Sequence, residues 1–313
     1  MTTAELPQVT PVRRQRKRSA AATTPAPSRR RWSALAGTSK RRSSGPGLLG
    51  PTDLPGPRVR LGILWFLLAV TAATAGRWPS ALLWAATAAL AATDLVQVWR
   101  AWGEVADRPG PQRRIAAVGA AIVVLAAAIG SGTVGVALIV VGVGSIVASV
   151  VLGRSGRPSP ELMMASLLPA IAAAPVVLVV LVGPWAAIFL ILAVSLYDAG
   201  NFLIGAQARH AWEGPVCGII GILAVTFTMA AFQPEPFNGP ATWAVGLVLA
   251  LACPLGQAVM TAFLPSRSTE AIHARRLDTY LLAAPLFLIG VWIIYKIGEK
   301  QEDFESTEPE PGS

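Results

Sequence analysis

This 313-residue sequence is poor in charged residues. They make up only 14% of the chain, whereas roughly a quarter of the residues in a globular protein are charged. It has only two cysteines, and both lie in apolar runs, which excludes a disulfide framework and a cysteine-based zinc ribbon. Apolar residues make up 53% of the chain, and the mean hydropathy is +0.55. This composition is typical of an integral membrane protein.

The net charge of +9 comes from the N-terminal tail. Residues 1–60 hold 13 of the 26 Lys and Arg but only two acids, so residues 61–313 carry 13 basic and 15 acidic side chains, a net charge of −2. The tail is poor in apolar residues, and we expect a disordered cytoplasmic segment that contacts anionic lipid. No folded RNA-binding motif accompanies the charges, so we expect no nucleic-acid partner. Because about 60 residues precede the first apolar run, we expect no cleaved signal peptide.

From residue 61 onward, apolar runs alternate with short polar breaks. Most runs reach the roughly 17–25 residues that a bilayer-spanning helix needs, and none alternates polar and apolar residues as a barrel strand would. The prediction is an all-α, polytopic membrane bundle of about nine transmembrane helices within residues 61–298, followed by an acidic disordered tail at 299–313. The runs cover about 61–76, 79–98, 114–131, 134–152, 163–183, 185–205, 215–232, 241–264 and 280–297.

The basic residues predict the orientation of the bundle, since short cytoplasmic loops collect Lys and Arg. If the N-terminal tail is cytoplasmic, four further loops lie on that side, and Arg77 is the lone basic residue in the short turns of the opposite side. We therefore expect a cell-membrane protein with its N-terminus in the cytoplasm and its C-terminus outside. The cytoplasmic loops hold Arg100, Arg108, Arg113, Arg154, Arg157, Arg209, Arg267, Arg275 and Arg276.

Two carboxylates lie inside predicted helices, where each costs roughly 2.5–3.5 kcal/mol to insert and is a candidate for function. Asp94 lies about one turn inside the cytoplasmic end of the second run, and either snorkels to the interface or pairs with Arg100. Asp198 lies about seven residues inside the end of the sixth run, with Asn201 as a second polar group beside it. An interhelical hydrogen-bonding pair is the structural alternative to a functional role for this acid.

The loop after the sixth run gathers several polar side chains, among them Arg209, His210 and Glu213. His210 taken alone is typical of a solvated loop histidine. The Gly214-x-x-x-Gly218 spacing that follows predicts close helix packing.

Arg275, Arg276 and Asp278 precede the ninth run, on the same predicted side as Asp198 and Glu213. Carboxylates suit a divalent cation such as magnesium, and guanidinium groups suit phosphate, so this cluster is a candidate site for a phosphate-bearing ligand. A set of ion pairs at helix ends is the alternative interpretation.

Three stretches carry a family resemblance: Asp198-x-x-Asn201-Phe202-x-x-Gly205, Trp212-Glu213-Gly214 and Arg276-Leu277-Asp278-x-x-Leu281-Leu282-x-Ala284-Pro285. Over residues 190–290 the chain resembles the C-terminal half of the phosphatidate cytidylyltransferases (CDP-diacylglycerol synthases). The resemblance implies a polytopic helical enzyme of phospholipid biosynthesis that joins CTP to phosphatidate and releases pyrophosphate, with Mg²⁺ and acidic residues at the cytoplasmic face.

The resemblance also implies roles for single residues. Asp198 and Asp278 would be the catalytic, magnesium-binding acids. The substrate-binding residues would be Asn201, Arg209, His210, Glu213, Arg275 and Arg276.

Two positions depart from the family pattern. Arg275 stands where the signature has its first Asp, and Gln257 stands where an acid is expected. A non-catalytic relative that binds anionic lipid or a membrane partner is therefore the alternative to an enzyme. A transporter would need paired interrupted helices, which the sequence does not show.

The sequence is compatible with a monomer or a homodimer.

Overall fold

The computed structural model describes residues 58–102, 110–152, 160–205, 208–237, 239–264 and 273–305. Within them the regular structure is entirely helical, as predicted. The elements are α1 (Arg58–Ala75), α2 (Arg77–Trp102), α3 (Pro111–Ala127), α4 (Ser131–Leu152), α5 (Pro160–Val182), α6 (Pro184–Gly205), α7 (Glu213–Phe232), α8 (Gly239–Phe263), the 3₁₀ helix η1 (Ala274–Arg276) and α9 (Tyr280–Glu305).

Each of the nine predicted apolar runs coincides with one of the nine α-helices in this part of the chain. Helix boundaries differ from the prediction mainly at polar ends, since α1 begins at Arg58 and α9 continues to Glu305. Of the predicted acidic tail, residues 299–305 continue α9, whereas 306–313 lie outside the described residues. The basic tail was predicted to be disordered over residues 1–60, but residues 58–60 belong to α1, and residues 1–57 lie outside the described residues.

Seven of the described helices, α2 and α4 to α9, are long and apolar enough to cross a membrane, so the chain is an integral membrane protein. The apolar part of α1, Gly62–Ala75, is shorter, and α3 has 17 residues. Outward-facing side chains agree with this assignment, because α4 exposes Ile139, Val140 and Val151 where a soluble protein would place polar groups.

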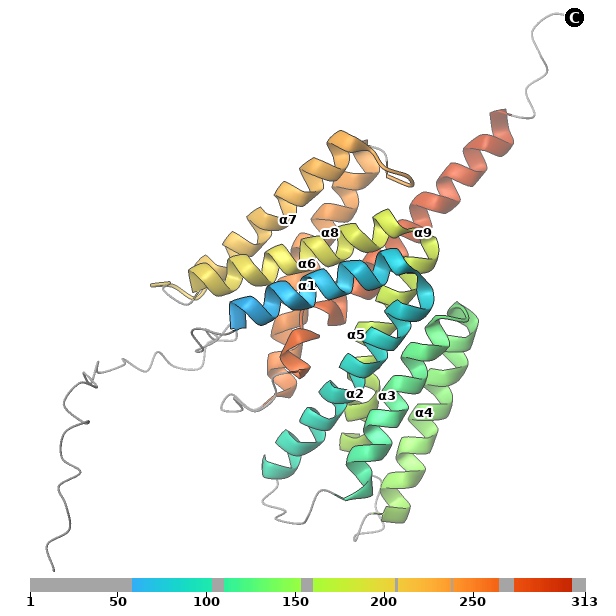
Figure 1. The fold of residues 1–313 in the computed structure, drawn as a ribbon, viewed down its shortest axis with the longest axis vertical. Helices are drawn as coiled ribbons and strands as arrows, with labels where there is room; N and C mark the ends of the chain where they lie inside the picture. The colour runs from blue at the N-terminus through green and yellow to red at the C-terminus, as the bar shows by residue number, and fades with distance from the viewer. Residues whose placement is uncertain are drawn as a thin grey trace, which may run out of the picture. The chain divides into compact units, whose positions relative to one another are not determined.

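The helices pack as two groups that share α5 and α1 (Figure 1). In one group, α3 packs against α2, α4 and α5. In the other, α7 packs against α6 and α8, and α8 packs against α9. Two helices connect the groups. Helix α1 contacts both α6 and α2, and only Gly76 separates it from α2 in the chain. Helix α5 contacts α9 as well as α2 and α3. The second group contains the residues that carry the family resemblance.

Glycines bring α6 and α7 into backbone contact. A Cβ atom added at Gly218 would lie 2.7 Å from the carbonyl oxygen of Tyr197, and one added at Gly200 would lie 3.0 Å from the Cys217 carbonyl. These distances are shorter than a side chain tolerates. The close packing predicted from the glycine spacing is therefore confirmed, and it fixes the helix that carries Asp198.

We expect Gly218→Ala to destabilise the protein, because the added methyl group would force α6 and α7 apart, at a cost of about 1–3 kcal/mol. The matched control is Gly144→Ala on α4, where nothing lies within 4 Å of the added atom. Thermal unfolding in detergent should show a lower midpoint for Gly218→Ala alone. Equal midpoints for the two variants would contradict the packing.

Candidate functional site

Helix α9 begins inside the bundle. Ala274, Leu277 and Thr279, which lead into its first turn, are buried. Gly256 on α8 permits this approach, because a Cβ there would lie 2.7 Å from the carbonyl oxygen of Asp278. The chain therefore carries Asp278 toward α6 and α8.

The carboxylates of Asp198 and Asp278 meet at Thr279. The Thr279 hydroxyl lies 2.7 Å from Asp198 Oδ1 and 3.2 Å from Asp278 Oδ1, and the Thr279 backbone N–H donates to Asp278 Oδ1 at 2.7 Å. Because both oxygens neighbour one hydroxyl, they lie no more than 5.9 Å apart, the sum of the two hydroxyl distances. Both acids are partly exposed. The structure thus brings together the two acids that the sequence predicted to be catalytic.

The carboxylate pair has uncharged polar neighbours on α6 and α8. The side-chain oxygen of Gln257 accepts hydrogen bonds from the Tyr197 hydroxyl at 3.1 Å and from the Asn201 amide at 3.0 Å. Gln257 is the residue that replaces an expected acid, and here it joins two helices by hydrogen bonds. Asn201 was predicted to bind substrate, and its side-chain amide donates one hydrogen bond to Gln257.

The two arginines before α9 have different surroundings. Arg275 is close enough to Asp278 for electrostatic attraction between guanidinium and carboxylate. The guanidinium carbon of Arg276 lies 5.6 Å from the ring centroid of Trp65 on α1, within the range of a cation–π contact. Trp65 packs edge-on against Trp84, which packs edge-on against Tyr280. Helix α1 therefore helps to position Arg276.

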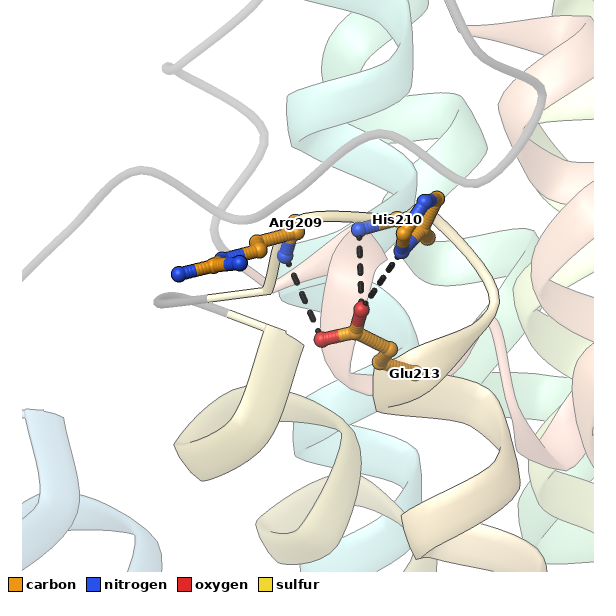
Figure 2. Close-up of polar contacts among 3 residues, drawn as sticks. All are labelled: Arg209, His210 and Glu213. Atoms are coloured by element: carbon orange, nitrogen blue, oxygen red, sulfur yellow. Dashed lines mark hydrogen bonds and ion pairs between the residues drawn. The ribbon is translucent and has the colours of Figure 1, made fainter.

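Glu213 organises the loop that precedes α7 (Figure 2). Its carboxylate accepts hydrogen bonds from the backbone N–H groups of Arg209 at 3.2 Å and His210 at 3.1 Å, and it lies 2.9 Å from His210 Nδ1. The Arg209 guanidinium points away from this carboxylate. The His210 ring stacks on Trp212, with 6.1 Å between centroids. Glu213 thus shapes the loop, and the substrate contacts of Arg209 and His210 stay a prediction.

Asp94 makes a contact that the sequence did not reveal. It is only 8% exposed, and it binds His273, which was not among the predicted site residues. The Arg100 side chain lies outside the described residues. The usable signal was the general rule that a carboxylate within a membrane bundle needs a partner.

Within the part of the chain that the structure describes, no group of three or more His, Cys, Asp or Glu side chains gathers as a metal site. A cation between Asp198 and Asp278 would therefore have two protein carboxylates, with the Thr279 hydroxyl beside them.

The sequence matches no protein-family model and no curated protein.

We expect Glu213→Ala to free the loop, because the Arg209 and His210 N–H groups would lose their acceptor. Hydrogen exchange at these two amides should become faster. The control is Glu161→Ala, which removes an exposed acid from the first turn of α5. Unchanged exchange in Glu213→Ala would contradict the role assigned to this carboxylate.

Proposed function

We propose that the protein is a membrane nucleotidyltransferase of the phosphatidate cytidylyltransferase type, acting in phospholipid biosynthesis. The observation that supports this proposal best is the meeting of Asp198 on α6 with Asp278 before α9 at one shared hydroxyl. These are the two acids to which the family resemblance assigns metal binding.

The donor set fits magnesium. Mg²⁺ is usually held by one or two carboxylates, with water and substrate phosphates completing its coordination, so Asp198 and Asp278 suffice. When bound, the ion would supply positive charge against the triphosphate. Both acids are partly exposed, as a site that also takes water and phosphate oxygens requires.

In the proposed reaction, a phosphate oxygen of phosphatidate attacks the α phosphorus of CTP. The bond from that phosphorus to the oxygen bridging to the β phosphorus breaks, and pyrophosphate leaves with the electron pair. The products are CDP-diacylglycerol and pyrophosphate. Such chemistry depends on placing positive charge near phosphate oxygens.

Arginines supply that charge from two elements. Arg275 and Arg276 lie three and two residues before Asp278, and the Trp65 ring orients the Arg276 guanidinium. Arg209 extends from the loop that Glu213 holds, with its guanidinium directed away from Glu213. We assign these three guanidinium groups to substrate phosphates, since guanidinium binds phosphate through paired hydrogen bonds.

The proposal includes a nine-span topology with a cytoplasmic N-terminus and the C-terminus on the opposite side of the cell membrane. At 1.5 Å per residue, the 18 residues of α1 reach about 27 Å, close to the apolar thickness of a bilayer. Nine crossings place the arginine-bearing connections on one side, as the charge rule requires. In this topology the start of α9 and the end of α6, which carry the carboxylate pair, lie on the cytoplasmic side, where CTP is found.

The alternative is a non-catalytic relative that binds anionic phospholipid. Two features favour it: Arg275 introduces a positive charge where the family has an acid, and Gln257 is engaged with Tyr197 and Asn201. In this case Arg275 and Arg276 would hold a lipid phosphate without a cation.

The deciding experiment uses the purified full chain in liposomes containing phosphatidate, with radiolabelled CTP and Mg²⁺. We expect CDP-diacylglycerol and pyrophosphate in equal amounts, and a loss of at least about 100-fold in Asp278→Asn, because the developing phosphate charge loses its compensation. The control Glu161→Gln should retain activity. Product no higher than from empty liposomes, together with phosphatidate binding that EDTA leaves unchanged, would favour the non-catalytic alternative.

A further inference from the structure

A buried carboxylate, Asp94, ties α2 to the entry of α9. Asp94 Oδ2 accepts a hydrogen bond from the backbone N–H of His273 at 2.8 Å and lies 3.1 Å from His273 Nδ1. The two residues are 179 positions apart in the chain. One bond goes to the backbone, so Asp94 fixes the path of the main chain as well as the imidazole ring.

The path from His273 to Asp278 is held by further backbone hydrogen bonds. Arg276 N–H donates to the His273 carbonyl at 3.1 Å, and Leu277 N–H donates to the Ala274 carbonyl at 3.1 Å. Leu281 N–H then donates to the Asp278 carbonyl at 3.3 Å. These turns connect the two positions without a long free segment, so we expect a displacement at His273 to move Asp278 as well.

Helix α2 also holds the other end of the connection between α8 and α9. The indole N–H of Trp99 donates to the carbonyl oxygen of Phe263, the last residue of α8, at 2.8 Å. Trp99 and Asp94 thus bind the last residue before the connection and the first described residue after it. Helix α2 lies outside the family-like segment 190–290, yet it binds residues of that segment on both sides of this connection.

We propose that Asp94 and His273 are positioning residues for the carboxylate pair, which hold Asp278 opposite Asp198. The inference rests on the proposed function in one respect, namely that the pair binds a divalent cation. Neither residue needs to touch that cation. Asp94 acts through the His273 backbone, and His273 acts through the hydrogen-bonded turns that lead to Asp278.

The test measures Mn²⁺ binding to the full chain in detergent by electron paramagnetic resonance, with no substrate present. Removing a partner that orients a metal ligand typically weakens metal affinity about 10–100-fold, and we expect this loss for Asp94→Ala. Asp94→Asn should recover most of the affinity, because its amide oxygen still accepts from His273 N–H. His273→Ala should have an intermediate effect, because it keeps the backbone donor and loses only the ring contact.

The matched control is Thr87→Val, which removes another buried polar group from α2. Thr87 is 5% exposed and bonds only within its own helix, to the Leu83 carbonyl. Thr87→Val should bind Mn²⁺ like the unmodified chain. If Asp94→Ala is not recovered folded, the Mn²⁺ affinities of the other variants decide the question. The proposal requires the affinity to fall from the unmodified chain to Asp94→Asn and further to His273→Ala.

The outcomes separate the two proposals. An unmodified chain that binds no Mn²⁺ would remove the cation site, and with it any need for positioning. An unmodified chain that binds Mn²⁺ while Asp94→Ala and His273→Ala bind it equally well would overturn the positioning role alone. Equal weakening in Thr87→Val would assign the effect to general destabilisation of α2, and would also overturn it.

Discussion

A carboxylate within an apolar helical bundle is poorly solvated, so it must find a donor or a counter-charge among its neighbours. Three acids of this chain are in that position, and all three find their partners in the short segment that leads into α9. Asp94 binds His273, while Asp198 and Asp278 share Thr279. The entry of α9 is therefore the polar centre of the bundle, next to α2, α6 and α8.

The helices could be predicted because the membrane leaves the backbone few choices. Runs of apolar residues long enough to span a bilayer must satisfy their backbone groups internally, and helices do so. Each predicted run is a helix. The apolar pattern was less informative at polar ends, where α1 begins with Arg58 and α9 continues into charged residues at Glu305. At these ends the helix extends beyond the apolar run into polar residues, so hydropathy does not mark the helix boundary.

The site could be predicted only in part. The predicted topology puts Asp198 and Asp278 on one side of the membrane, and the structure brings them to a common hydroxyl. The contacts of Glu213 are local, three and four positions back along the chain, and its role in organising the loop could be expected from the sequence. The contact of Asp94 was beyond sequence reasoning, because it joins residues 179 positions apart and depends on how the chain folds in three dimensions.

The most direct measurement is cross-linking of Asp198→Cys with Asp278→Cys in a chain whose Cys217 and Cys253 are replaced by serine. A short bifunctional thiol reagent should join the two positions, and mass spectrometry of the linked peptides should identify α6 and the start of α9. Asp198→Cys paired with Glu235→Cys, which lies in the connection between α7 and α8, should stay unlinked. Absence of the first link, or equal formation of both, would contradict the meeting of the two acids.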